Sequence, residues 1–202
     1  MSEKLLPLTG VALMIGGVLF AVAEASESLF FPFGSQPLSV RFVTPAAQAI
    51  ELISWLYTAF FLLGLIGLYL YQLEKIGSLG LITFLITYIG LLLSIGSLWS
   101  AVFLWPEVAV RVPEWTDSLA STPPPLLGTG VLLSGFLAGI GWVLFGIASL
   151  VAKMLPRTAL VMMVTGMLLL PFTPAVPALL AGAGFVWLGY FLRQRSDAGQ
   201  SP

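Results

Sequence analysis

The sequence contains neither cysteine nor histidine. These absences exclude disulfides, thiol chemistry, haem held by His or Cys, and zinc sites built from nitrogen and sulfur ligands. The lack of histidine also removes the commonest general base near neutral pH. Any catalysis would rest on carboxylates, hydroxyls or the few basic side chains, and the sequence indicates no cofactor and no metal site.

Charged residues are scarce as well: they make up 8% of the chain, against about 25% in an average soluble domain. Hydrophobic residues make up 58%, and the mean hydropathy is +1.03. No polybasic cluster is present that would bind nucleic acid or a specific phosphoinositide. The composition therefore predicts an integral membrane protein whose partners are membrane lipids and not nucleic acid.

Six apolar stretches nearly fill the chain, at residues 5–23, 49–72, 79–104, 126–151, 158–172 and 175–192. Each predicts a helix, because a lone segment in lipid has no other way to satisfy its backbone hydrogen bonds. A helix needs about 20 residues to cross the hydrocarbon core. The expected fold class is all-α: a polytopic transmembrane bundle of about six spans, forming one domain over residues 1–195 with a disordered polar tail over 196–202.

Two parts of this arrangement have alternatives. The first stretch, with Lys4 before it and Ala21-Val22-Ala23 at its end, also resembles a signal peptide. Its length favours an uncleaved span. The fifth and sixth stretches are short and are joined by Pro171-Phe172-Thr173-Pro174. We expect a tight hairpin there and not one broken segment, which would separate Lys153 from Arg193.

The basic residues divide between the two sides of the expected bundle. Six lie before the first stretch, after the last, or in the loops on the same side as both ends: Lys4, Lys75, Lys153, Arg157, Arg193 and Arg195. Only Arg41 and Arg111 lie in the alternate loops. Because cytoplasmic loops carry an excess of Lys and Arg, this division predicts a multi-pass protein with both termini in the cytoplasm.

Small and polar residues recur on one face of the third and fourth stretches, at steps of three and four. Small residues let helices approach closely in lipid, so we expect helix packing at Thr83, Thr87, Gly90, Ser94, Ser97, Gly135, Gly139 and Gly146. A leucine at Gly139 is then expected to separate two helices. The alternative is a polar-lined path along the third stretch, although the absence of a mid-span charge argues against a proton relay.

Two aromatic residues fall near the expected mid-membrane level, Tyr88 and Trp142. Most others lie near span ends, as an interfacial belt requires. We expect both exceptions to pack between helices with their polar atoms hydrogen-bonded there. A contact with a ligand is the alternative.

Three carboxylates provide the one candidate ligand site. Glu24 continues the small-residue face of the first stretch, Glu51 begins a polar face of the second, and Glu107 lies at a similar depth. We hypothesise that Glu24 and Glu51 face a shared vestibule at the outer rim, where carboxylates could bind a small cationic ligand, either an amine or a metal ion. The alternative is separate surface charges paired with Arg41 or Arg111.

Three glycine-bearing segments contain packing and turn residues: 64–69, 77–81 and 141–148, the last of which leads to Leu155-Pro156-Arg157. In this order they resemble a group of small, uncharacterised bacterial integral membrane proteins with about six helices. The resemblance implies a location in the bacterial cytoplasmic membrane and supplies no active site.

The expected function is a structural or accessory membrane component without enzymatic activity. The first alternative is a small-molecule transporter or channel-like subunit, and the second is a membrane-embedded enzyme acting on lipid. A filled interior would favour the expected function, a cavity along the third stretch would favour transport, and a lateral opening beside the carboxylates would favour the enzyme.

Overall fold

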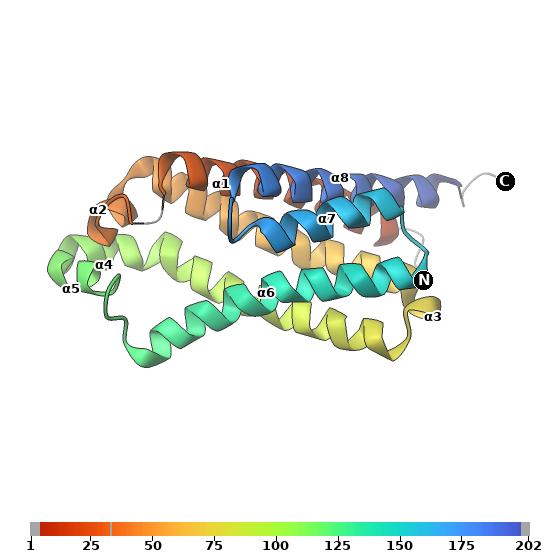
Figure 1. Ribbon diagram of the computed structural model, residues 1–202. Helices are drawn as coiled ribbons and strands as arrows, with labels where there is room; N and C mark the ends of the chain where they lie inside the picture. Colours follow the sequence, from red (N-terminus) through yellow and green to blue (C-terminus); the bar gives the residue numbers. More distant parts are fainter. Residues whose placement is uncertain (1–4, 33, 199–202) are drawn as a thin grey trace.

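The computed structural model describes residues 5–32 and 34–198, and the described chain is helical with no β-strand. Its elements are α1 (Leu5–Phe30), α2 (Leu38–Val43), α3 (Pro45–Phe103), α4 (Trp105–Arg111), α5 (Pro113–Ser118), α6 (Pro125–Ala152), α7 (Arg157–Leu169) and α8 (Ala175–Ala198), arranged as an elongated bundle (Figure 1). The all-α prediction is confirmed.

Helix α3 doubles back on itself at Gly77. The backbone there has φ 63° and ψ −164°, a conformation that glycine adopts readily and other residues do not. Aromatic pairs join the two halves on either side of this glycine: Tyr69 stacks on Phe84 at 4.4 Å between ring centroids, and Trp55 meets Phe103 at 6.0 Å. The two halves therefore form an antiparallel hairpin.

Within the described residues, four helices are long and apolar enough to cross a membrane: α1, α3, α6, and α8 over Ala175–Arg195. Helix α7 is apolar but has 13 residues, which corresponds to about 20 Å, against about 30 Å for a hydrocarbon core. Large apolar side chains cover the outside of the bundle, including Leu126 and Leu132, which are 90% and 75% exposed. A surface of this kind suits lipid and not water.

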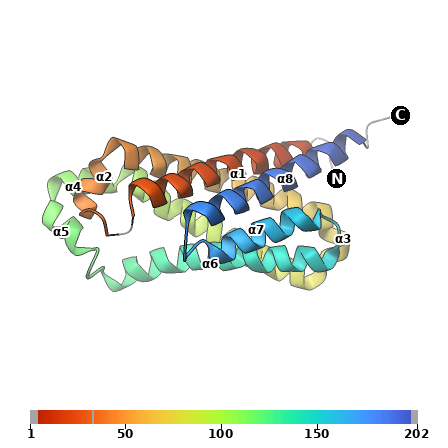
Figure 2. The same cartoon turned by 45° about the horizontal axis from the view of Figure 1, so that its top comes forward.

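Close helix contacts hold the bundle together at glycines. Helix α1 lies between α8 and the first half of α3, and α7 lies against α8 and α6 (Figures 1 and 2). A Cβ on Gly10 would lie 2.7 Å from the Gly189 carbonyl oxygen, and one on Gly17 would lie 2.9 Å from the Gly182 carbonyl oxygen. Close packing of this kind drives helix association in lipid.

Several helices run further than the apolar stretches, whereas α7 ends at Leu169, before the end of its stretch at residue 172. Helix α1 continues past residue 23 to Phe30, and the two long loops contain α2, α4 and α5. Helix α8 continues to Ala198, so residues 196–198 are helical where the sequence predicted a disordered tail. Residues 199–202 lie outside the described chain.

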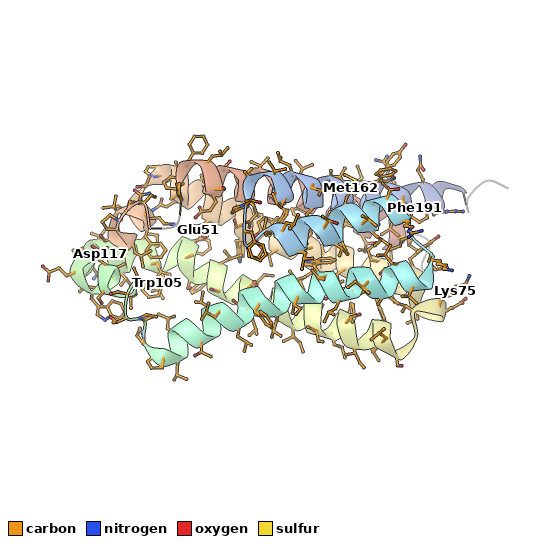
Figure 3. The ribbon with its side chains drawn as sticks, in the orientation of Figure 1. Glu51, Lys75, Trp105, Asp117, Met162 and Phe191 are labelled. Atoms are coloured by element: carbon orange, nitrogen blue, oxygen red, sulfur yellow. The ribbon has the colours of Figure 1, made fainter. Side chains whose placement is uncertain are left out.

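The two ends of the bundle differ in charge. Lys75 lies at one end, whereas Glu51, Trp105 and Asp117 lie at the other (Figure 3). The turn of α3, the α6–α7 connection and the end of α8 share the first of these ends (Figure 1); we call it the terminal end, and the opposite one the acidic end. Lys4 lies outside the described chain.

Candidate binding cavity

The small-residue stripe of α3 makes a helix contact over part of its length. A Cβ on Gly90 would overlap the backbone of Ala138 on α6, and one on Gly141 would lie 2.6 Å from Thr87 Cα. The Thr87 hydroxyl donates to the Thr83 carbonyl oxygen at 2.7 Å, so it is satisfied within its own helix. This part of the stripe is therefore a tight crossing between the second half of α3 and α6, as predicted, and not a polar path.

The glycines of α6 differ in what they face. A Cβ on Gly146 would lie 2.6 Å from Met163 Cε of α7, which is a helix contact. A Cβ on Gly135 or Gly139 would meet no atom within 4 Å. The packing role expected for these two glycines is therefore corrected: they face open space, because they lie on a different face of α6 from Ala138 and Gly141, which contact α3.

That space is a cavity of about 320 Å³ between α1, both halves of α3, α6 and the end of α7. Its lining combines apolar side chains with a few polar ones: Phe20, Glu24, Tyr57, Thr58, Phe61, Leu91, Ser94, Ser97, Leu98, Val131, Ser134, Gly135, Ala138, Gly139, Trp142, Met167 and Leu170. Because Ser94 and Ser97 lie here, the stripe of α3 passes from the helix contact into the cavity wall.

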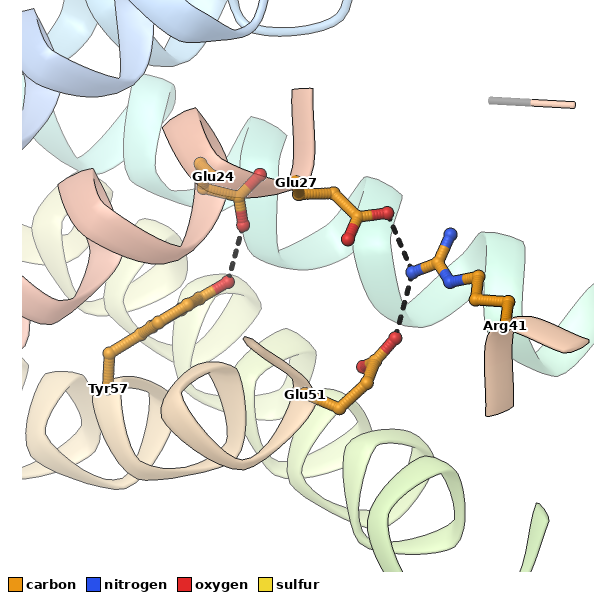
Figure 4. Close-up of polar contacts among 5 residues, drawn as sticks. All are labelled: Glu24, Glu27, Arg41, Glu51 and Tyr57. Carbon is orange, nitrogen blue, oxygen red and sulfur yellow. Dashed lines mark hydrogen bonds and ion pairs between the residues drawn. The ribbon is translucent and has the colours of Figure 1, made fainter. Parts of the chain in front are cut away.

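Glu24 and Tyr57 form the polar corner of the cavity. The Tyr57 hydroxyl donates to Glu24 Oε1 at 2.7 Å (Figure 4). The ring of Tyr57 meets that of Phe20 edge to face at 5.3 Å between centroids. Among the described residues, no basic side chain forms an ion pair with Glu24. The cavity therefore contains a single carboxylate, which has no cationic partner among the described residues and lies beside aromatic rings.

An aromatic cluster closes the cavity toward the terminal end. The ring of Trp142 lies 5.5 Å from that of Phe61 and 4.8 Å from that of Phe185, between centroids, and Phe145 packs beside it. Trp142 is buried between helices as expected, with 1% of its surface exposed. Its Nε1–H, however, has no acceptor among the described residues, which corrects the expectation that this polar atom is hydrogen-bonded.

Arg41 of α2 forms ion pairs with two other carboxylates near the cavity. Its Nη2 lies 2.7 Å from Glu27 Oε1 on α1 and 2.9 Å from Glu51 Oε1 on α3 (Figure 4). The backbone N–H and hydroxyl of Ser39 donate to the Asp117 carboxylate of α5 at 2.8 and 2.9 Å. Helix α2 is thus attached to α1, α3 and α5, and its arginine does not form an ion pair with Glu24.

The structure brings two of the three candidate carboxylates to the same site. Glu24 lines the cavity, and Glu51 lies nearby with its carboxylate on Arg41 (Figure 4). Glu107 does not line the cavity: its side chain is 73% exposed and lies 3.8 Å from Arg111. Among the described residues, no group of three acidic side chains is arranged to hold a metal ion. A ligand role for Glu24, Glu51 or Glu107 stays a prediction.

Two further residues of this site were not singled out from the sequence. Tyr57 is one of the aromatic residues near a span end, where the sequence predicts only an interfacial position, and the sequence predicts no role for Glu27. Both carried a signal in their spacing, because Tyr57 follows Ser54 by three residues and Glu27 follows Glu24 by three. The spacing does not predict the residue that each of them contacts on another helix.

The lining of the cavity suits a ligand that is both cationic and apolar. It offers one carboxylate, a phenol, serine hydroxyls and aromatic rings within an otherwise apolar bundle. Comparisons of the chain with protein-family models, with curated proteins and with solved structures find no match.

Proposed function

We propose that this chain is a multi-pass membrane protein that binds a small organic amine in the cavity, with the ammonium group at Glu24. The observation that carries the proposal is the distribution of charge: among the described residues, Glu27 and Glu51 share Arg41, whereas Glu24 has only the Tyr57 hydroxyl as a partner. An unpaired carboxylate among apolar side chains is costly. A bound ammonium group would supply the missing partner.

The other polar atoms of the lining support an ammonium ligand. The Ser94 hydroxyl donates to the Ser134 carbonyl oxygen at 3.4 Å. The Ser134 hydroxyl donates to the Val131 carbonyl oxygen at 2.8 Å. Since these hydroxyls are already donors, their oxygens are left as acceptors. An ammonium group offers three donors and no acceptor, so it complements this set.

The aromatic walls favour an organic cation over a metal ion. Phe20, Tyr57, Phe61 and Trp142 all line the cavity, and aromatic faces attract ammonium groups by about 0.5–2 kcal/mol each. A metal ion would need several oxygen ligands in its first shell. With a single carboxylate in the lining, the site is better suited to an amine.

A binding function also agrees with the shape of the interior. A purely structural role goes with a filled bundle, whereas this one contains a cavity of about 320 Å³, which is within the size range of small-ligand sites. The aromatic cluster around Trp142 closes the cavity toward the terminal end. Binding is therefore better supported than passage through an open channel.

Loss of the Glu24 charge is expected to weaken amine binding. The probe is benzylamine, measured by equilibrium dialysis with the full chain in lipid nanodiscs. Glu24→Gln keeps the shape of the side chain but removes a hydrogen bond to a charged group, which corresponds to about 10- to 100-fold weaker binding. Glu107→Gln is the matched control and should bind as the wild type does, because Glu107 is exposed and lies outside the cavity.

The neutral probe benzyl alcohol separates charge from shape. Its binding should not depend on the Glu24 charge, since it brings no ammonium group. Equal affinity of the wild type and Glu24→Gln for benzylamine would contradict the proposed site.

The topology within this proposal is six passes with both termini in the cytoplasm of a bacterial cell, as the resemblance and the charge pattern imply. Each half of α3 makes one pass, and α7 makes a short one. The elements at the terminal end contain Lys75, Lys153, Arg157, Arg193 and Arg195. An excess of basic residues on the cytoplasmic side supports this orientation.

Single-cysteine labelling tests the orientation, and the native chain adds no background because it has no cysteine. Lys75→Cys and Lys153→Cys are expected to react with a membrane-impermeant maleimide only after the cytoplasmic face is exposed in inverted vesicles. Trp115→Cys is expected to react in intact cells. Labelling of positions 75 and 115 from the same side would overturn the orientation.

A further inference from the structure

A second space lies beside the cavity, where α6 diverges from α3. It is an apolar groove of about 640 Å³ between α2, the second half of α3, the start of α4, the segment that follows α5 and the start of α6. Leu93 and Leu127 line its sides, and Phe42 and Trp105, stacked at 5.8 Å between ring centroids, also line it. Exposed apolar side chains surround it on α6, which places its open side toward lipid.

The groove and the cavity are adjacent. Ser97 of α3 and Val131 of α6 line both spaces. Beyond the crossing at Gly90, the glycines of α6 provide no side chain to fill the gap, since a Cβ on Gly130 or Gly135 would meet no atom within 4 Å. Ser97 and Val131 therefore form the boundary between the groove and the cavity, one turn beyond the Ser94 hydroxyl that donates to the Ser134 carbonyl oxygen at 3.4 Å.

We propose that the natural ligand is a single-chain amphiphile with an amine headgroup, which reaches Glu24 sideways from the lipid and leaves its alkyl chain in the groove. This inference rests on the proposed function, because it takes the amine site at Glu24 as given and adds the chain. The polar groups lie in the cavity and the apolar surface in the groove, which is the order of a headgroup and its chain.

The adjacency of the two spaces favours an alkyl chain over a partner helix as the occupant. A helix with its side chains is about 10 Å across and could cover the groove, but it could not extend into the cavity between Ser97 and Val131. An alkyl chain with an ammonium end is thinner than a helix, and we assign it to both spaces. The single carboxylate at the far side of the cavity gives the chain a direction, headgroup first.

The test is a competition between dodecylamine and benzylamine in nanodiscs, with dodecylamine expressed as a mole fraction of the lipid. The wild type is compared with Gly130→Trp, whose new side chain enters the groove from a position that lines the groove alone. Leu133→Trp is the control, because Leu133 is 47% exposed and lines neither space. Comparing variants in the same lipid cancels the partitioning of dodecylamine into the bilayer.

In Gly130→Trp, the affinity for benzylamine is expected to stay within about twofold of the wild-type value, because Gly130 lines the groove and not the cavity. The mole fraction of dodecylamine that displaces half of the benzylamine is expected to rise by about tenfold or more, because the tryptophan excludes the chain. Leu133→Trp should leave both values unchanged, and dodecanol should compete poorly in every variant because it has no ammonium group.

Two outcomes would overturn the inference while leaving the amine site intact. In the first, the protein binds benzylamine, but Gly130→Trp does not change the mole fraction of dodecylamine that displaces it. The other is competition by dodecanol that equals competition by dodecylamine. Absence of benzylamine binding to the wild type would instead overturn the proposed function, and the amphiphile with it.

Discussion

Replacing Gly90 with leucine is expected to prevent the bundle from assembling stably. The Cβ of any side chain at this position overlaps the Ala138 backbone on α6, and backbone cannot move aside as a flexible side chain can. Overpacking of an interior costs about 1–3 kcal/mol when side chains can adjust, so a clash with backbone should cost at least that. The measurement is the thermal unfolding temperature in detergent, together with the size-exclusion profile.

Gly96→Leu is the matched control for Gly90→Leu. Both glycines lie in the second half of α3, but a Cβ on Gly96 meets no atom within 4 Å. This variant should unfold at the wild-type temperature or above it, since leucine also favours helix over glycine by up to about 1 kcal/mol. Wild-type stability of Gly90→Leu would mean that α3 and α6 do not cross at this glycine.

Gly139→Leu is expected to keep the fold and lose the ligand. In an ordinary small-residue stripe a leucine would push two helices apart, but here it extends into the cavity and displaces only empty space. We expect the unfolding temperature to stay near the wild-type value. Benzylamine binding should weaken by more than about 100-fold, because the leucine side chain fills the space that the amine would occupy.

Both readouts are needed to interpret Gly139→Leu. Leu144→Ile, at an exposed position of the same helix, should leave stability and binding unchanged. If Gly139→Leu lowered the unfolding temperature as Gly90→Leu does, the cavity beside Gly139 would be filled by a neighbouring helix. If it bound benzylamine with wild-type affinity, the amine would lie elsewhere.

The sequence alone determined the helical class and the presence of helices that are long and apolar enough to cross a membrane. Both follow from composition, because a chain with 8% charged residues cannot form a water-exposed surface, and lipid leaves the backbone little choice but helix. The reversal of α3 was also predictable, since Glu74-Lys75-Ile76-Gly77 is polar and ends in a glycine. These features depend on local properties that each segment has by itself.

Helix ends were less predictable, for a reason that α1 illustrates. Its apolar stretch ends at residue 23, but its backbone stays helical to Phe30. Hydrophobicity marks where lipid begins and ends, whereas the helix ends where its hydrogen bonds end. The two boundaries coincide only when a proline or glycine interrupts the backbone at the membrane surface.

Only the tertiary structure decided which small residues make contacts and which carboxylate stays unpaired. The stripe predicted the same role for Gly90 and Gly139, yet one touches the facing backbone and the other faces a cavity. Gly139 lies between Ala138 and Gly141, which contact α3, but on a neighbouring face of α6. Spacing likewise placed Glu24 and Glu51 at one end, but Arg41 comes from a short helix whose position depends on Ser39 and Asp117. Contacts between elements distant in sequence determined that Glu51 pairs with Arg41 and that Glu24, among the described residues, has no basic partner.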